Sequence, residues 1–227
     1  MNRRDRGLLV GTLLGDSSIH MTQYNCIFQF THQIKQKEYA FYKADLLFRM
    51  FGGKTKEPRY YKTDTKFGSV EYYKFGFANK YFNYLHRIAY SNQGKKYFSR
   101  KLLNYLTPHG IALWYMDDGG VSKSGSKDKN GVLREHQTIE MRISTYCSLE
   151  EIENIISYFL EVWDIQAKKR YAKKTDSYYL AFNSQNSKKL EELIAPFIIE
   201  YFRYKLPSFY NTRVQNILPE MKDDDIV

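Results

Sequence analysis

The sequence predicts an α+β protein in which two similar units follow one another in a single chain. Two observations predict this arrangement. An apolar helical run ends in acidic residues twice, at Asp16 and at Asp117-Asp118, and Asp16 and Asp118 are 102 residues apart. The strand-like segment 75–79 has a similar counterpart at 180–184, which lies 105 residues further along. Two nearly equal offsets indicate an internal duplication.

The composition permits a compact protein and favours a polyanionic partner. The chain has 227 residues, 43% of them hydrophobic, which is enough for one domain or two small ones. Its formal net charge of +10 favours nucleic acid as the first partner and an anionic membrane as the second. No apolar run is long enough to span a membrane. Cys26 and Cys147 lack metal-ligand spacing and are typical of reduced thiols in an intracellular protein.

The elements of the first unit follow from periodicity and from helix-breaking residues. Residues 8–15 predict a short helix that is apolar on nearly all sides and therefore buried. Gly11 and Gly15 share one face of it, so another backbone can approach closely there. The elements that follow are expected to be strands at 18–23 and 25–31, a helix at 37–51, strands at 54–62 and 70–78, and a helix at 80–90.

The second unit repeats this order after a polar link and a short helix at 102–106. Thr107-Pro108 suits the start of the second apolar helix, because threonine caps helices and proline fits their first turn. A capping box at 148–151 begins a further helix, and Pro196 should kink or split the last one. The expected elements are a strand from 121, a strand at 139–144, a helix at 149–160, strands at 166–174 and 178–183, and a helix at 187–204.

The ends of the two apolar helices carry the chemistry. The helices are expected to pack through Gly11, Gly15, Ala112 and Met116. Asp16 and Asp118 would then meet, and two carboxylates a few ångströms apart cannot both ionise cheaply without a cation. Oxygen ligands select a hard divalent ion, Mg²⁺ in cells, which could support phosphodiester hydrolysis. The alternative, that each aspartate merely ends its helix, does not explain their equivalent positions.

The same two segments resemble the motif pair of a known family. Residues 9–17, Leu-Val-Gly-Thr-Leu-Leu-Gly-Asp-Ser, and residues 111–119, Ile-Ala-Leu-Trp-Tyr-Met-Asp-Asp-Gly, resemble the paired LAGLIDADG motifs of homing endonucleases. Two further segments resemble those of the single-chain, intron-encoded branch of this family, namely Leu106-Thr107-Pro108 and Lys205-Leu206-Pro207. The first motif departs from the pattern, because Ser17 replaces the final glycine.

The resemblance implies a fold in which one αββαββα unit is used twice. The first repeat would span residues 1–92, a linker 93–106 and the second repeat 107–227. The two LAGLIDADG helices would pack together, and each repeat would present a four-stranded antiparallel sheet as a saddle over the major groove of double-stranded DNA. The protein would be a monomer that forms a pseudo-dimer within one chain.

The resemblance also implies a metal site at the helix ends. Carried over residue by residue, Asp16 and Asp118 are catalytic and bind divalent cations, two or more, with Mg²⁺ as the expected ion. The backbone carbonyls of Gly15 and Asp117 would be additional ligands. The side chain of Asp117 has no role in this scheme.

The family further places a basic residue near each scissile phosphate. Lys205 fits one of these places. Either Lys95 or Lys96 fits the other, and Lys96 is favoured. A lysine there would stabilise the charge of the phosphorane or orient water.

The outward faces of the strands are expected to read DNA. Lysine and arginine suit guanine edges or phosphates, and glutamine suits adenine. In the first half, alternation selects Gln29, Thr31, Lys54, Lys56, Tyr60, Lys62 and Lys74. In the second half, it selects Glu140, Arg142, Ser144, Gln166, Lys168, Arg170 and Lys174.

The predicted function is therefore that of a site-specific DNA endonuclease. It would make double-strand breaks in a long, weakly symmetric target, and the resemblance adds short 3′ overhangs and a role in intron mobility. The alternative is a nucleic-acid binder that does not cleave, such as an RNA-splicing maturase on the same scaffold. The abundance of Lys, Tyr, Phe, Ile and Asn indicates an AT-rich gene, which fits a mitochondrion, a chloroplast, a phage or a bacterium alike.

Overall fold

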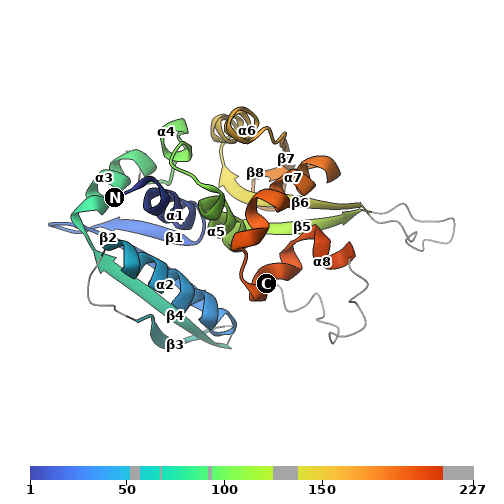
Figure 1. The fold of residues 1–227 in the computed structure, drawn as a ribbon. Helices are drawn as coiled ribbons and strands as arrows, with labels where there is room; N and C mark the ends of the chain where they lie inside the picture. The colour runs from blue at the N-terminus through green and yellow to red at the C-terminus, as the bar shows by residue number, and fades with distance from the viewer. Residues whose placement is uncertain (52–56, 67, 92–93, 125–137, 212–227) are drawn as a thin grey trace.

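The computed structural model describes residues 1–51, 57–66, 68–91, 94–124 and 138–211. Within these ranges the chain forms two α+β halves that lie side by side, with helices α1 and α5 between them (Figure 1). Each half begins with one of these two helices, as the duplicated order predicts.

The first half contains the elements expected from its periodicity. They are α1 (Arg3–Leu14), β1 (Ser17–Met21), β2 (Cys26–Gln33), the 3-10 turn η1 (Ile34–Gln36), α2 (Lys37–Phe51), β3 (Arg59–Thr65), β4 (Gly68–Ala78) and α3 (Lys80–Ala89). Helix α1 starts five residues before the predicted position, because the Asn2 side chain caps it by accepting from the Asp5 N–H.

The second half repeats this order after the short helix α4 (Arg100–Leu103). Its elements are α5 (Pro108–Asp118), β5 (Gly119–Ser124), β6 (Thr138–Cys147), α6 (Leu149–Trp163), β7 (Lys168–Ala172), β8 (Ser177–Ala181), α7 (Ser184–Ile194), η2 (Ala195–Phe197), η3 (Glu200–Lys205) and α8 (Pro207–Asn211). The predicted final helix is split after Ile194, where Pro196 lies in η2.

In the described ranges the strands form two four-stranded antiparallel sheets. Their orders are β1-β2-β4-β3 and β5-β6-β8-β7, so the two sheets have equivalent topologies. In each sheet the second and the last strand of the half form the central pair. This equivalence confirms the two-sheet fold that the duplication and the family resemblance imply.

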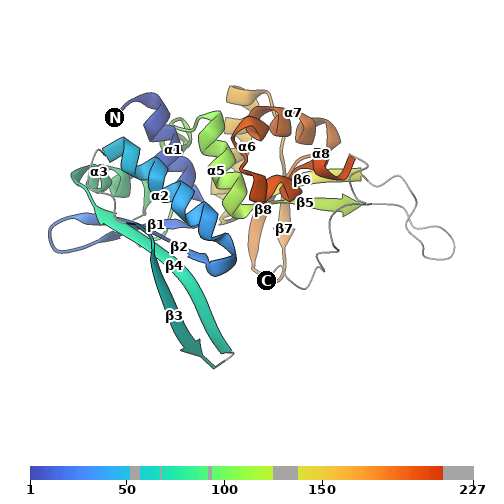
Figure 2. The same cartoon turned by 60° about the horizontal axis from the view of Figure 1, so that its bottom comes forward.

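One face of each sheet is buried beneath helices. Phe28 and Phe30 lie on the buried face of the first sheet, against α2 and α3. Met141 and Ile143 lie on the buried face of the second, against α6 and α7. Figure 2 shows that the β3–β4 hairpin extends beyond α2, and every residue of β3 is exposed. No helix in the described part of the chain is long and apolar enough to cross a membrane.

Candidate active site

Helices α1 and α5 pack backbone to backbone along a stripe of small residues. The close contacts pair Gly7 with Thr107, Gly11 with Gly110, and Gly15 with Asp117. A β-carbon at Gly11 would overlap the carbonyl group of Gly110, so only glycine fits there. Gly11 and Gly15 therefore lie in the interface as predicted.

The prediction that Ala112 and Met116 face these glycines is wrong. Both are buried, but the α5 residues closest to the α1 glycines are Thr107, Gly110 and Asp117. These three recur at helical spacing on one face of α5, whereas Ala112 lies on a different face.

The packing brings Asp16 and Asp118 to one end of the helix pair. Burial, together with the nearby Asp16 and Asp117 carboxylates, raises the pKa of Asp118 to about 8. The pKa of Asp16 is also raised, by loss of water around it and by the Asp117 carboxylate. Repulsion between neighbouring carboxylates contributes to both shifts, and a bound cation would relieve it.

Two lysines reach the same helix ends. Lys96 donates from Nζ to the Gly15 carbonyl at 2.8 Å, and Lys205 donates to the Met116 carbonyl at 2.7 Å. Lys205 Nζ also lies 3.4 Å from the Asp117 carbonyl. Burial lowers the pKa of both lysines, and the nearby carboxylates oppose this shift. Lys95 is exposed, whereas Lys96 contacts the end of α1 at the Gly15 carbonyl.

The side chain of Asp117 points across the interface into the first half. Its carboxylate accepts from Lys43 Nζ at 2.9 Å and from the backbone N–H of Asp16 at 3.0 Å. The side chains of Lys43 and Asp117 both have 0% exposure. Lys43 escaped the sequence analysis, although a charged residue on the buried stripe of α2, beside Ala40 and Ala44, was a visible signal.

His32 is a further neighbour that the sequence analysis missed. Its Nδ1 lies 4.0 Å from Asp16 Oδ2, and ligand atoms of Asp16, His32 and Asp117 all lie within 4.8 Å of one another. Burial lowers the pKa of His32 to about 4, and Lys43 contributes, so its ring is neutral at physiological pH. In the sequence it lies between Thr31 and Gln33, and no metal-ligand spacing marks it.

The residues at these helix ends fit hard divalent cations. Asp16 and Asp118 offer carboxylate oxygens, and the carbonyls of Gly15 and Asp117 lie at the same ends, where Lys96 and Lys205 contact them or lie close by. Burial first, and the neighbouring carboxylates second, raise the pKa of Asp16 and of Asp118, so an ionised carboxylate here would gain from a bound cation. Oxygen ligands of this kind suit Mg²⁺ and similar ions.

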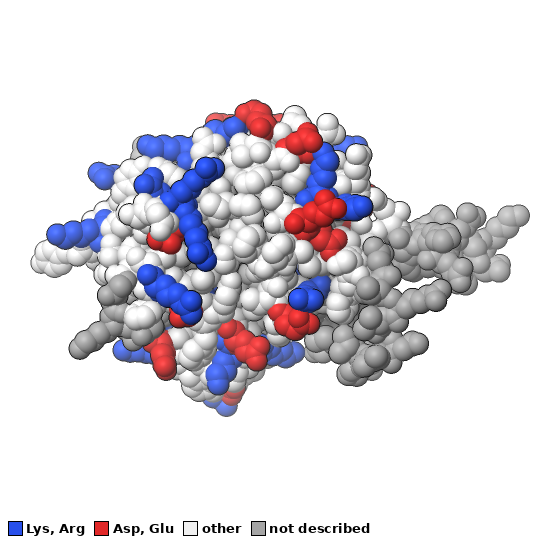
Figure 3. All heavy atoms as spheres, in the orientation of Figure 1, with Lys and Arg blue, Asp and Glu red and all other residues white. Residues whose placement is uncertain are grey.

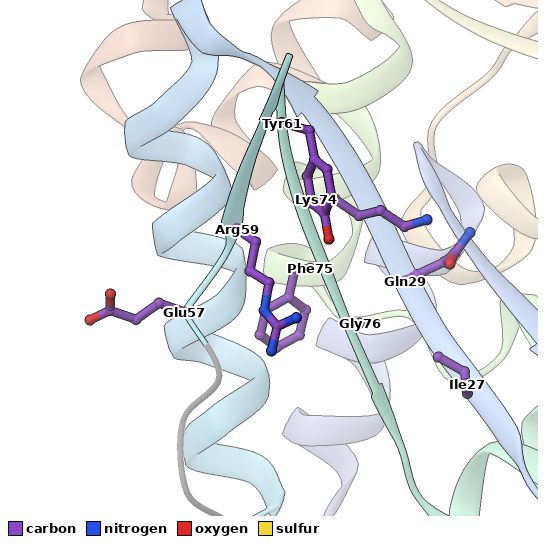
Figure 4. A pocket seen from close by; sticks show the side chains of 8 residues that line it. All are labelled: Ile27, Gln29, Glu57, Arg59, Tyr61, Lys74, Phe75 and Gly76. Carbon is purple, nitrogen blue, oxygen red and sulfur yellow. The ribbon is translucent and has the colours of Figure 1, made fainter. Parts of the chain in front are cut away.

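A concave hollow lies on the open face of the first sheet. Gln29, Arg59, Tyr61 and Lys74 line it together with the strand backbone at Gly76 (Figure 4). The register explains the grouping, because Thr31, Lys74 and Arg59 are direct cross-strand partners and therefore point to one side. Gln29, Thr31 and Lys74 thus occupy the open face, as predicted.

Two predicted positions of β3 point to the opposite face. Tyr60 pairs with Tyr73 and packs against its ring at 5.9 Å, and Lys62 pairs with Glu71 in a 3.2 Å ion pair. The prediction that Tyr60 and Lys62 share a face with Lys74 is therefore wrong. β3 is exposed on both faces, so no buried side chain marks which alternate residues point inward. Lys54 and Lys56 lie outside the described residues.

The open face of the second sheet carries the basic residues predicted for it. Arg142, Ala181 and Lys168 form one cross-strand row. Ser144, Tyr179 and Arg170 form the next row. Of the remaining predicted positions, Glu140 lies one row further along β6, Gln166 precedes β7, and Lys174 lies in the turn before β8.

The face of the molecule seen in Figure 3 is not uniformly basic. Basic and acidic side chains are interspersed on it.

Comparisons with known proteins give a consistent result. A model of the LAGLIDADG DNA endonuclease family matches residues 6–190. "Protein RecA" of Mycolicibacterium chitae is 24% identical over 202 residues, which cover 88% of this chain and 45% of that protein. The chain thus spans about half the length of the first curated relatives that it matches.

Two fungal relatives cover most of both sequences. "Probable intron-encoded endonuclease 1" of Wickerhamomyces canadensis is 25% identical, over 87% of this chain and 81% of the relative. "Cytochrome b mRNA maturase bI2" of Debaryomyces hansenii is 23% identical, over 89% and 73%.

Solved structures share the fold. The homing endonuclease I-WcaI bound to its DNA recognition sequence superposes with a TM-score of 0.71 at 23% identity, over 90% of this chain and 86% of that one. I-DmoI in complex with DNA and Mn superposes with a TM-score of 0.50 at 15% identity, over 85% and 96%.

Proposed function

This chain belongs to the LAGLIDADG DNA endonuclease family, and on this basis we propose that it is a site-specific homing endonuclease that cuts double-stranded DNA. The observation that carries the proposal is the convergence of Asp16, Asp118, Lys96 and Lys205 at the end of the helix pair. A binder without catalysis does not require neighbouring carboxylates beside two half-buried lysines.

In phosphodiester hydrolysis the two aspartates would bind metal and the two lysines would stabilise negative charge. Asp16 and Asp118, with the carbonyls of Gly15 and Asp117, would hold divalent cations, Mg²⁺ in cells, which when bound activate water and stabilise the leaving oxygen. Lys96 and Lys205 place ammonium groups beside the carboxylates, where they stabilise the added negative charge of a phosphorane. The fold holds all four groups in place before DNA arrives, so little reorganisation is needed.

The two open sheet faces provide the DNA-binding surface in this proposal. Arg59, Lys74 and Gln29 would contact one half of the target, and Arg142, Lys168 and Arg170 the other. The residues differ between the halves, so the target would be only weakly symmetric. Residues 1–92 and 107–227 would each serve one half-site within a monomer.

The second candidate function is RNA splicing by a maturase. The relative from Debaryomyces hansenii, whose name describes a maturase, favours it. The same basic faces could serve an RNA, but that activity does not require the paired carboxylates. Mobility of an intron in an organelle, phage or bacterium follows from the endonuclease proposal and not from the maturase alternative alone.

The proposal predicts cleavage of a specific plasmid in a randomised target library. In the presence of Mg²⁺ the protein should linearise only the plasmids that carry its site, and cutting should stop when EDTA removes the metal. Sequencing of the cut ends would give the target and the overhang. Tight binding without cutting of any library member would contradict the endonuclease function and favour the second candidate.

The strand register predicts which β3 residues bind that target. Arg59→Ala should weaken DNA affinity about tenfold, because Arg59 shares the open face with Lys74. Lys62→Ala is a matched control that removes a cation from the opposite face, where Lys62 pairs with Glu71. Affinity is measured by gel shift in EDTA at one fixed salt concentration. Equal losses in the two variants would contradict the assignment of the open face.

A further inference from the structure

The two halves of the active site are built differently around one position. In the duplicated motif Asp16 corresponds to Asp118, so Gly15 corresponds to Asp117. The two unlike residues meet at the interface, where a β-carbon on Gly15 would overlap the Asp117 carboxylate. The missing side chain of Gly15 therefore makes room for the carboxylate of Asp117.

The two acidic residues also differ in how their backbones are held. Asp118 is the last residue of α5, so the helix itself fixes its main chain. Helix α1 ends at Leu14, and Asp16 lies two residues beyond it. The backbone of Asp16 therefore needs another support, and its N–H donates to Asp117 Oδ2 at 3.0 Å.

Lys43 fixes the carboxylate that provides this support. Its Nζ donates to both oxygens of Asp117, at 3.2 Å and 2.9 Å, and neither side chain is exposed. The rings of Phe30 and Tyr39 lie 5.0 Å from the ammonium group and confine it. A buried ion pair of this kind is geometrically rigid, and removal of either partner leaves an uncompensated charge.

We propose that Lys43 and Asp117 are a positioning pair that holds Asp16, so that the second half of the chain supports the acidic residue of the first half. The inference rests on the proposed endonuclease function, in which each half supplies one acid to the reaction. Lys43 and Asp117 act through the backbone of Asp16 and need not touch DNA. Asp118 has its own support within α5, so loss of the pair affects the two acids unequally.

The consequence is a difference between the two DNA strands. An acid displaced by a fraction of an ångström slows its own cleavage step, on the order of tenfold to a hundredfold. Lys43→Met should therefore convert supercoiled target plasmid into a nicked form that accumulates, with one strand cut at the normal rate. Asp117→Asn should slow the same strand, because both variants loosen the same backbone.

Variants of the pair separate positioning from plain stabilisation. Each single variant leaves a buried charge and should lower the melting temperature, whereas Lys43→Met/Asp117→Asn removes both charges and should recover most of it. The strand preference should persist in the double variant, because no lysine then anchors the amide side chain at position 117. Lys189→Met, which breaks the exposed pair with Asp164, is the control and should leave both strands unchanged.

The experiment measures nicking on each end-labelled strand of the library-derived target, and the Asp16 amide by NMR in the metal-free protein. We expect one slowed strand and a shifted Asp16 amide resonance in all three variants of the pair. Equal slowing of both strands, or an unchanged Asp16 amide, would overturn the inference. If the wild type cuts no DNA, the proposed function fails, and the Asp16 amide alone decides whether the pair positions that residue.

Discussion

Asp118→Asn should reduce double-strand cleavage of DNA by about a thousandfold or more while target binding stays nearly unchanged. The substitution keeps the shape of the side chain but removes the charge that would hold a divalent cation. In the proposed function DNA affinity comes from the sheet faces, which the change does not touch. Cleavage is measured with Mg²⁺ on the target plasmid, and binding by gel shift in EDTA.

The same variant should be at least as stable as the wild type. Because the folded-state pKa of Asp118 is raised to about 8, the folded protein binds this proton more tightly than the unfolded chain does. The tighter proton binding stabilises the folded protein. This contribution is fully present below the pKa of the unfolded chain, and it is lost as pH rises through the folded-state pKa of Asp118. Asparagine never ionises, so the melting temperature of the variant should exceed that of the wild type at about pH 9, above the folded pKa.

The exposed substitution Asp45→Asn is the control for this prediction. Asp45 forms an i,i+4 pair with Arg49 on the surface of α2. It should change neither cleavage nor the pH dependence of melting. An Asp118→Asn protein that fails to fold would show that Asp118 only ends a helix, and one that still cuts both strands at the wild-type rate would exclude it from catalysis.

Gly11→Ala should destabilise the protein by about 3 kcal/mol or more. The new methyl group would overlap the backbone of Gly110, and neither backbone can move without separating α1 from α5. The free energy of unfolding is measured by urea denaturation followed by circular dichroism. The expected loss in the free energy of unfolding is large because Gly11 contacts the main chain of Gly110, which cannot move aside as a flexible side chain would.

Gly76→Ala is the matched control for that experiment. A β-carbon at Gly76 lies 3.4 Å from Gln29 Cβ, which is ordinary van der Waals contact. Its stability should therefore stay within about 1 kcal/mol of the wild type. If Gly11→Ala changed the free energy of unfolding as little as Gly76→Ala, α1 and α5 would tolerate a larger separation than the close packing indicates.

Much of the fold could be predicted because one face of most elements is buried. Alternation along β2 and β6 identified their open faces, and the residues predicted there occupy them. β3 has no such pattern, and the assignment of Tyr60 and Lys62 failed for that reason. When both faces of a strand are exposed to solvent, its sequence does not alternate between apolar and polar residues, so it does not indicate which residues point inward.

The positions of Asp16 and Asp118 at the helix ends could be predicted, whereas the contacts that Lys43 and His32 make there could not. Asp16 and Asp118 are marked by the duplication, which is a property of the sequence. Lys43 meets Asp117 across 74 positions of the chain, and His32 approaches Asp16 only through the fold. Such contacts depend on how helices and strands pack against one another in the fold, and no local sequence pattern determines that packing.

The meeting of Gly15 with Asp117 makes the two halves complementary and not interchangeable. Two copies of the second half would bring two Asp117 carboxylates together with no Lys43 to neutralise them. Two copies of the first half would bring two Gly15 residues together and leave a gap with two unpaired lysines. Only the unlike combination satisfies both shape and charge, so the interface itself selects the correct partner. A chimeric protein made by exchanging one half would have to carry Lys43 and Asp117 together.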